Sequence, residues 1–164
     1  MAVRTAPLRV GDRGRYEGAR FVVRGGLVLR HTSGARWTEW YASFEDGRGG
    51  WIAPSGDRAI VTFPAELPTF RSLRTGRPAW HAYVVEEKGR ARYESAEGAL
   101  PFAPAFGASY AYADLRGPEG AFATIDYSEE PPRLFLGKVT PFAALHLTSP
   151  RTSPPRAHPR RRTR

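Results

Sequence analysis

The sequence predicts an all-β, mainly antiparallel fold, and three observations carry that prediction. From about residue 10, short runs of alternating apolar and polar residues follow one another, separated by glycine-containing turns roughly every 8 to 12 residues. The chain holds 17 glycines and 15 prolines, which suits many tight turns. Hydrophobic residues make up 41% of its 164 residues, and about two-thirds of the unfolded surface is buried at this length, so we expect a single core.

Residues 8–63 are the predicted N-terminal half, which we expect to form an SH3-like small barrel or a bent meander. The adjacent pair Gly25-Gly26 predicts a bulge or bend in one of its strands. Alternation along that strand places four apolar side chains on one face: Phe21, Val23, Leu27 and Leu29.

Residues 64–79 have prolines near both ends and no regular period, which predicts a connector. A second β-rich half, residues 80–148, is expected to pack on the first as one compact unit. Thr140 followed by Pro141 is typical of a helix N-cap and first helical position, so we expect a short helix near 141–147. The strands of this half are expected over residues 80–93, 97–102, 109–115, 120–127 and 133–137.

The C-terminal stretch 149–164 combines prolines, hydroxyl residues and arginines with no bulky apolar group, which predicts a disordered basic tail. Its arginines are Arg151, Arg156, Arg160, Arg161, Arg162 and Arg164. These six account for most of the net charge of +9, which leaves 9 − 6 = +3 on the body. The tail is therefore a candidate for binding nucleic acid or an anionic membrane, and an unselected solvated end is the alternative.

Several classes of site have no support in the sequence. There is no cysteine, so thiolate metal sites, thiol nucleophiles and disulfides are excluded. The four histidines lack metal-ligand spacing, and no nucleophile elbow, P-loop or dinucleotide-binding glycine motif occurs. We therefore expect no metal and no cofactor. No apolar segment long enough for a transmembrane helix occurs either, which predicts a cytoplasmic location.

Short motifs occur along the chain in a fixed order. Those of the first half are Leu8-x-Val10-Gly11-Asp12-x-Gly14, Tyr16-x-Gly18-x-x-Phe21-x-Val23-x-Gly25, Trp37-x-Glu39-Trp40 and Trp51-Ile52. Those of the second half are Glu97-Gly98-x-x-Pro101-Phe102, Asp126-Tyr127 and Gly137. Together they resemble the bacterial family called domain of unknown function 4178 over roughly residues 8 to 147. The resemblance implies no catalytic residue, and the family's proximity to membrane-stress and polyamine-related components implies at most an accessory role.

The segment "RWTEWYASF" places one carboxylate, Glu39, among aromatic rings on a predicted strand with rings on both faces. A charge in this setting costs several kcal/mol unless it is paired or neutralised. One interpretation is a structural ion pair with an arginine of a neighbouring strand, namely Arg15, Arg20 or Arg24. A second is a pocket acid, with Trp37, Tyr41, Trp51 and Glu97 as the further candidate pocket residues. A third is an exposed strand face on which Glu39 has no particular role.

Three functional hypotheses follow. The first is a non-enzymatic interaction module that binds a protein partner, as an accessory to a membrane-stress system. The second is a small-ligand binder or hydrolase-like enzyme that uses Glu39 and Glu97 in a cleft between the halves. The third is an anionic-surface or nucleic-acid binder that acts through the basic tail.

Overall fold

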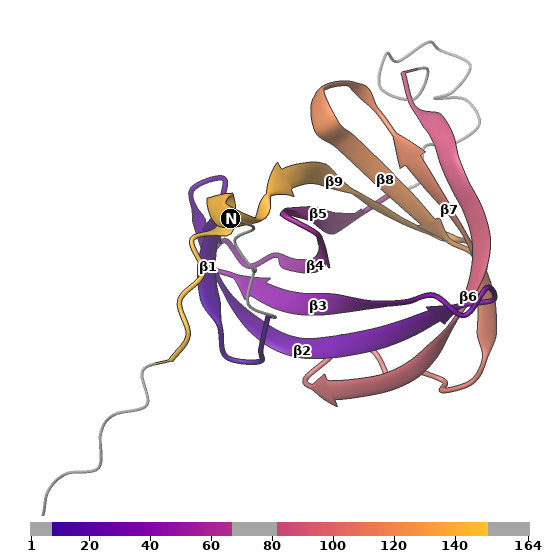
Figure 1. Cartoon of the computed structure of the whole chain (residues 1–164), viewed down its shortest axis with the longest axis horizontal. Helices are drawn as coiled ribbons and strands as arrows, with labels where there is room; N and C mark the ends of the chain where they lie inside the picture. Colours follow the sequence, from indigo (N-terminus) through magenta and orange to yellow (C-terminus); the bar gives the residue numbers. More distant parts are fainter. Residues whose placement is uncertain (1–7, 67–81, 151–164) are drawn as a thin grey trace, which may run out of the picture.

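The computed structural model describes residues 8–66 and 82–150, which form nine strands and two 3₁₀ turns (Figure 1). The strands are β1 (Arg13–Tyr16), β2 (Ala19–His31), β3 (Arg36–Phe44), β4 (Gly49–Ser55), β5 (Arg58–Ala65), β6 (Val84–Gly98), β7 (Ser109–Arg116), β8 (Ala121–Asp126) and β9 (Arg133–Pro141). The 3₁₀ turns are η1 (Pro118–Gly120) and η2 (Phe142–Leu145). All pairings are antiparallel, so the predicted fold class is confirmed.

Eight of the strands close into a barrel in the order β2-β3-β4-β5-β9-β8-β7-β6, and β6 pairs back to β2. The closure depends on the length of β2, since two strands pair with successive parts of its edge. β1 pairs with the part before the bulge, residues 19–22. β6 pairs with the part after it, residues 25–31. β1 is therefore an extra strand beside the closed barrel.

The two predicted halves do not form separate sheets. The strands β2 to β5 form a meander, which was one of the two forms expected for residues 8–63. This meander makes one side of the barrel rather than an SH3-like barrel of its own, because its two edges pair with strands of the second half. β2 pairs with β6, and β5 pairs with β9. Edge strands expose unpaired backbone groups, and these pairings satisfy them.

The predicted bulge in β2 is present, and it changes which face the side chains take. The register with β3 shifts immediately after Val23. Phe21 and Val23 therefore lie in a cluster outside the barrel, whereas Leu27 and Leu29 belong to one inside it. The prediction that these four side chains share one face is wrong, because the extra residue at the bulge reverses the alternation.

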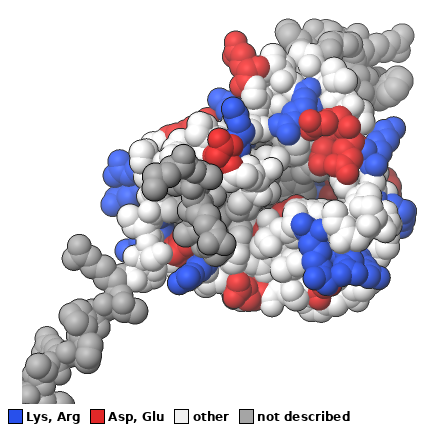
Figure 2. Space-filling model, viewed as in Figure 1, with Lys and Arg blue, Asp and Glu red and all other residues white. Residues whose placement is uncertain are grey.

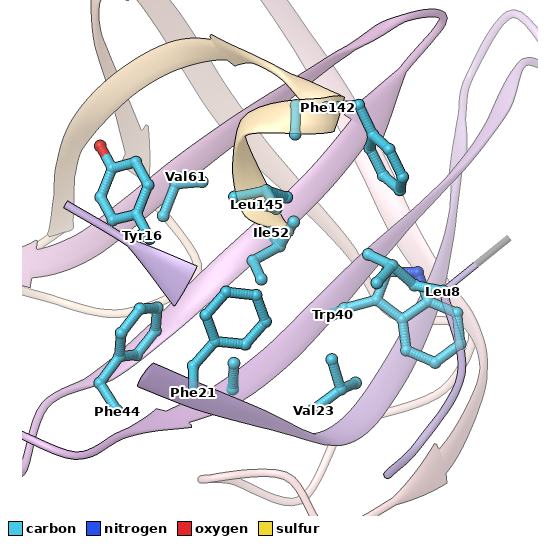
Figure 3. Packing of buried hydrophobic residues seen from close by; sticks show 12 residues of the cluster. Leu8, Tyr16, Phe21, Val23, Trp40, Phe44, Ile52, Val61, Phe142 and Leu145 are labelled. Carbon is cyan, nitrogen blue, oxygen red and sulfur yellow. The ribbon is translucent and has the colours of Figure 1, made fainter. Parts of the chain in front are cut away.

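A hydrophobic cluster, here called the outer core, covers the outward faces of β2 to β5 (Figure 3). β1, η2 and the segment before β1 lie over these strands and supply its other side. Its buried members are Leu8, Tyr16, Phe21, Val23, Trp40, Ala42, Phe44, Ile52, Ala59, Val61, Phe142 and Leu145. The outward row of β3 side chains is thus covered.

A single 3₁₀ turn, η2, takes the place of the helix expected near 141–147. It ends at Leu145, because the backbone of His146 adopts the left-handed conformation with φ of 46°. In a 3₁₀ turn residues three apart lie on one side, which brings Phe142 and Leu145 together into the outer core.

Parts of two predicted segments lie outside the described residues. Of the connector 64–79, the structure describes only residues 64–66, and of the tail 149–164 only Ser149 and Pro150. The hydroxyl of Ser149 donates a hydrogen bond to the buried carboxylate of Asp12 at 3.0 Å. This bond fixes the described end of the chain beside the start of β1.

Candidate ligand-binding cavity

The interior of the barrel is hollow. A cavity of about 1410 Å³ lies within it, and all eight barrel strands contribute lining residues. The space-filling view looks onto a hollowed face, with acidic side chains at its edge (Figure 2). An eight-stranded barrel holds either packed side chains or one small ligand. Here short inward side chains such as Ala53, Thr62 and Thr124 leave much of the interior unfilled.

Aromatic rings form much of the cavity wall: Trp37, Tyr41, Trp51, Tyr93, Phe102, Tyr110, Tyr112, Phe122 and Phe135. Several stand in ring-to-ring contact. The centroid of the Trp51 ring lies 5.4 Å from that of Tyr41 and 6.1 Å from that of Phe102. Tyr93 continues the series, 5.6 Å from Phe102 and 5.2 Å from Tyr110. These contacts make a continuous aromatic surface across β3, β4, β6 and β7.

The cavity is acidic although the protein as a whole is basic. Eight of the 16 acidic residues line it: Glu39, Glu66, Glu86, Glu87, Asp114, Asp126, Glu129 and Glu130. Of the 15 lysines and arginines that the structure describes, three do so: Arg36, Arg116 and Arg133. Each of these arginines already pairs with an acid, namely Glu94, Glu86 and Asp126 in that order. The excess negative charge therefore faces the empty space.

Glu39 is the acid at the centre of this arrangement. It lies opposite Leu27 of β2 and accepts a hydrogen bond from the Trp37 indole Nε1 at 2.9 Å. Burial raises the pKa of its carboxyl group to about 7, since removal from water disfavours the charged form. The Trp37 donor lowers this pKa, whereas the negative charges of Asp114 and Asp126 raise it. Glu39 thus shares its surroundings with two further acids.

Asp114 is another lining acid that forms no salt bridge among the described residues. Burial raises the pKa of Asp114, and a hydrogen bond with Thr124 and the positive charge of Arg116 oppose that rise. Asp126 differs, because Arg133 lies 3.5 Å from its Oδ2. The Arg133 guanidinium also lies 5.5 Å from the centre of the Phe102 ring. One cation–π contact is therefore already made at the cavity wall.

The tyrosine hydroxyls of the wall stay protonated at neutral pH. Burial raises the pKa of Tyr93 to about 12 and that of Tyr110 well above its usual range. The negative charge of Glu39 acts in the same direction on both. The two hydroxyls are hydrogen-bonded to each other, so one of the two O–H groups is left to donate to a ligand.

The structure brings four of the five candidate pocket residues together. Trp37, Glu39, Tyr41 and Trp51 all line the cavity. Glu97 does not, because it lies opposite Gly26 whereas Glu39 lies opposite the next residue of β2, so their side chains take opposite faces. Glu97 is exposed on the outside of the barrel. The expected pairing of Glu39 with Glu97 is therefore not formed.

The structural ion pair considered for Glu39 is not formed either. Arg20 pairs with Glu45 at 3.0 Å, and Arg24 donates a hydrogen bond to Ser43 Oγ at 3.3 Å. Arg15 lies on β1, outside the barrel. Within residues 8–66 and 82–150, Glu39 has no salt-bridge partner, and its one hydrogen bond comes from Trp37.

Sequence reasoning missed the contribution of β7 and β8. Four inward residues of β7 alternate with other residues: Tyr110, Tyr112, Asp114 and Arg116. The signal was present, since "SYAYADLR" alternates aromatic or charged side chains with alanine and leucine. Such a pattern predicts a strand whose apolar face packs and whose aromatic and charged face lines a site. What the sequence lacks is the pairing order that places this strand across from Glu39.

Neither a metal site nor a membrane-spanning helix is found among the described residues. No group of three or more His, Asp or Glu side chains in them is arranged to hold a metal ion. No helix in this part of the chain has the length and apolar character needed to cross a membrane.

The fold and the cavity define this protein as an antiparallel eight-stranded barrel with an aromatic, acidic interior. The chain belongs to the family "Domain of unknown function (DUF4178)", whose model matches residues 9–142. This agrees with the resemblance found in its motifs. No curated protein and no solved structure matches the chain.

Proposed function

We propose that this protein binds a small organic cation inside the barrel, and the observation that carries the proposal is the excess of acids over basic residues in the cavity lining. Among the described residues, eight acids and three paired arginines line the cavity, whereas 16 acids and 15 basic residues occur in this part of the chain as a whole. An acidic cavity attracts cations and repels anions, and low-dielectric walls strengthen both effects.

The chemistry of the wall favours an organic cation rather than a bare metal ion. Nine aromatic rings offer the negative faces that attract ammonium and guanidinium groups. The contact of Arg133 with Phe102 is an internal example of this interaction. The described acids are not grouped as metal ligands. A ligand that combines an apolar body with a positive group would contact both kinds of lining residue.

Glu39 and Asp114 are the proposed charge partners of the ligand. Both are buried enough for their pKa to rise, and neither forms a salt bridge among the described residues, although the positive charge of Arg116 acts on Asp114. A buried acid without a counter-charge costs folding free energy. A bound cation would lower that cost and keep the carboxylate ionised, so binding energy would come from charges that are unsatisfied in the free protein.

This proposal develops the ligand-binding hypothesis with Asp114 in the place of Glu97, and it assigns no reaction. The protein-partner hypothesis has no supporting observation in the described residues. The tail hypothesis concerns Arg151 to Arg164, which lie outside them. If a ligand screen found no ligand for the cavity, both hypotheses would remain as alternatives.

The test uses three probes of similar size and different charge: benzyltrimethylammonium, benzyl alcohol and benzoate. Trp37 and Trp51 line the cavity, so their fluorescence reports occupancy. At pH 8 we expect benzyltrimethylammonium to bind at least about tenfold more tightly than benzyl alcohol, and benzoate to bind weakest. The double variant Glu39→Gln, Asp114→Asn should reduce the affinity for the cation to that for the alcohol.

Glu97→Gln provides the matched control, since it removes an acid from the outer side of β6. It should leave the affinity for all three probes unchanged. Equal binding of the charged and neutral probes, or tightest binding of benzoate, would refute the proposal.

A further inference from the structure

A row of three arginines crosses the outside of the barrel. Arg30 of β2 lies directly opposite Arg36 of β3 on one side and Arg92 of β6 on the other. Like charges at directly opposed positions of neighbouring antiparallel strands destabilise a sheet. Without a bound anion, repulsion within this arginine row therefore destabilises the sheet at this place.

The surrounding residues offset little of this charge. Glu94 contacts two of the three, with Arg36 Nη2 at 2.7 Å and Arg30 Nε at 3.5 Å. The buried Nε of Arg30 has no hydrogen-bond partner within the described residues. Arg92 is exposed, and it makes no ion pair in the part of the chain that the structure describes. Arg90 adds a fourth guanidinium, held by Ser109 Oγ at 3.1 Å. Glu94 is thus the one carboxylate among the described residues that pairs with these four guanidiniums, and it contacts only Arg30 and Arg36.

A hollow of about 280 Å³ lies beside two members of this row, Arg30 and Arg92. The hydroxyl residues Thr32 and Ser109 also line it, and neither an acid nor Arg36 is among its described lining residues. Basic side chains gather over the corresponding end of the molecule, where the end of β2 meets β6 in the same view (Figure 2). Positive charge, hydroxyl donors and a concave surface coincide at this place.

We propose that the arginine row and its hollow bind a phosphate group. A guanidinium donates two parallel hydrogen bonds to phosphate oxygens, and several guanidiniums around one phosphate share its charge. Arg92, which makes no ion pair among the described residues, supplies such donors without breaking an existing bond. A bound dianion also removes the repulsion between the opposed arginines. The described lining of the hollow shares only His31 with that of the interior cavity, so the phosphate site is distinct from the site proposed for the cation.

The test compares two single variants that lose the same charge. Arg92→Gln removes a member of the row, and Arg24→Gln removes an exposed arginine of β2 that contacts Ser43 instead. Inorganic phosphate is titrated by calorimetry against sodium chloride of equal ionic strength. We expect Arg92→Gln to lower the affinity for phosphate at least tenfold and Arg24→Gln to preserve it.

A second readout separates binding from folding. Without phosphate, Arg92→Gln should melt at or above the temperature of the wild type, because it relieves repulsion between like charges. With phosphate, the order should reverse, since only the wild type gains stability from the ligand. A merely structural role of Arg92 would lower the melting temperature under both conditions and would overturn the proposal.

Vesicles identify the source of the phosphate. Binding of inorganic phosphate without recruitment to vesicles indicates a small soluble phosphorylated ligand. Recruitment to phosphatidylcholine vesicles that contain phosphatidic acid, lost in Arg92→Gln, indicates a lipid headgroup. The basic tail is the same in all variants, so a difference between them reports the arginine row. If phosphate binds no better than chloride and the vesicles show no dependence on Arg92, or if Arg24→Gln loses as much as Arg92→Gln, the proposal is wrong.

Discussion

The two faces of β3 present two different environments on one strand. On the outward face, Trp40, Ala42 and Phe44 are at most 8% exposed and pack in the outer core. On the inward face, Trp37 and Tyr41 stay partly exposed along a large cavity. The outward face thus buries apolar area that stabilises the fold. The inward face keeps its rings and its carboxylate in contact with empty space, where they are available to a ligand.

The difference also explains why a carboxylate is tolerated in the middle of the strand. A residue on the outward face could hold a charge only with a partner in close-packed surroundings. The inward face offers Glu39 a hydrogen-bond donor and the option of taking up a proton. Natural proteins depart from the simplest folding rules mostly where a site requires it. The comparison between the faces therefore supplies a set of tests.

The largest expected effect comes from truncation on the outward face. Phe44→Ala should lower the free energy of unfolding by about 3–5 kcal/mol, since it removes a buried ring in contact with Phe21 and Phe63. Tyr41→Ala on the inward face should lower it by only about 1–2 kcal/mol, because that ring is only partly buried and borders a cavity. Urea unfolding with a common m-value measures both. Equal losses would mean that the inward face is packed as tightly as the outward one.

A stabilising effect is expected from neutralising Glu39. Its pKa is about 7 in the folded chain against an ordinary value of 4.5, so the unfolded chain releases this proton first as pH rises. Stability therefore falls between those two pH values and stays reduced above about pH 7. Glu39→Gln should gain about 1–3 kcal/mol at pH 8 and almost nothing below pH 4.5. Urea unfolding across this range, with Glu97→Gln as a control that does not change, provides the measurement.

The same proton sets the pH dependence of ligand binding. A cation favours the ionised form of Glu39, so its affinity should rise as pH increases through about 7. We expect benzyltrimethylammonium to bind up to about tenfold more tightly at pH 8 than at pH 6. Glu39→Gln should bind it weakly with little pH dependence, whereas benzyl alcohol should show none with the wild type. If the affinity for the cation fell with rising pH, the titration of a group other than Glu39 would control binding.

Features that depend on residues adjacent in the chain could be predicted from the sequence. Features that depend on residues brought together by folding could not. Alternation in β3 correctly put Trp37, Glu39 and Tyr41 on one face, because that is a property of the strand alone. The assignment of Leu27 to the face of Phe21 failed, since one extra residue at the bulge inverts everything after it. The residues that surround Glu39 in space could not be predicted from the sequence, for a different reason. Asp114 comes close only because the barrel closes, and no local pattern encodes that closure.

The smallest expected effect tests the one hydrogen bond that favours the charged form of Glu39. The Trp37 indole lowers the pKa of this carboxyl group against the larger effect of burial. Trp37→Phe keeps a ring at the cavity wall and removes the donor, so the pKa of Glu39 should rise by about one unit. NMR titration of the Glu39 side-chain carboxyl carbon measures that change directly. The onset of cation binding should move to higher pH by the same amount, because both observations report one proton. An unchanged titration would mean that another donor or water replaces the indole, and the inward face of β3 would then be more adaptable than its single hydrogen bond indicates.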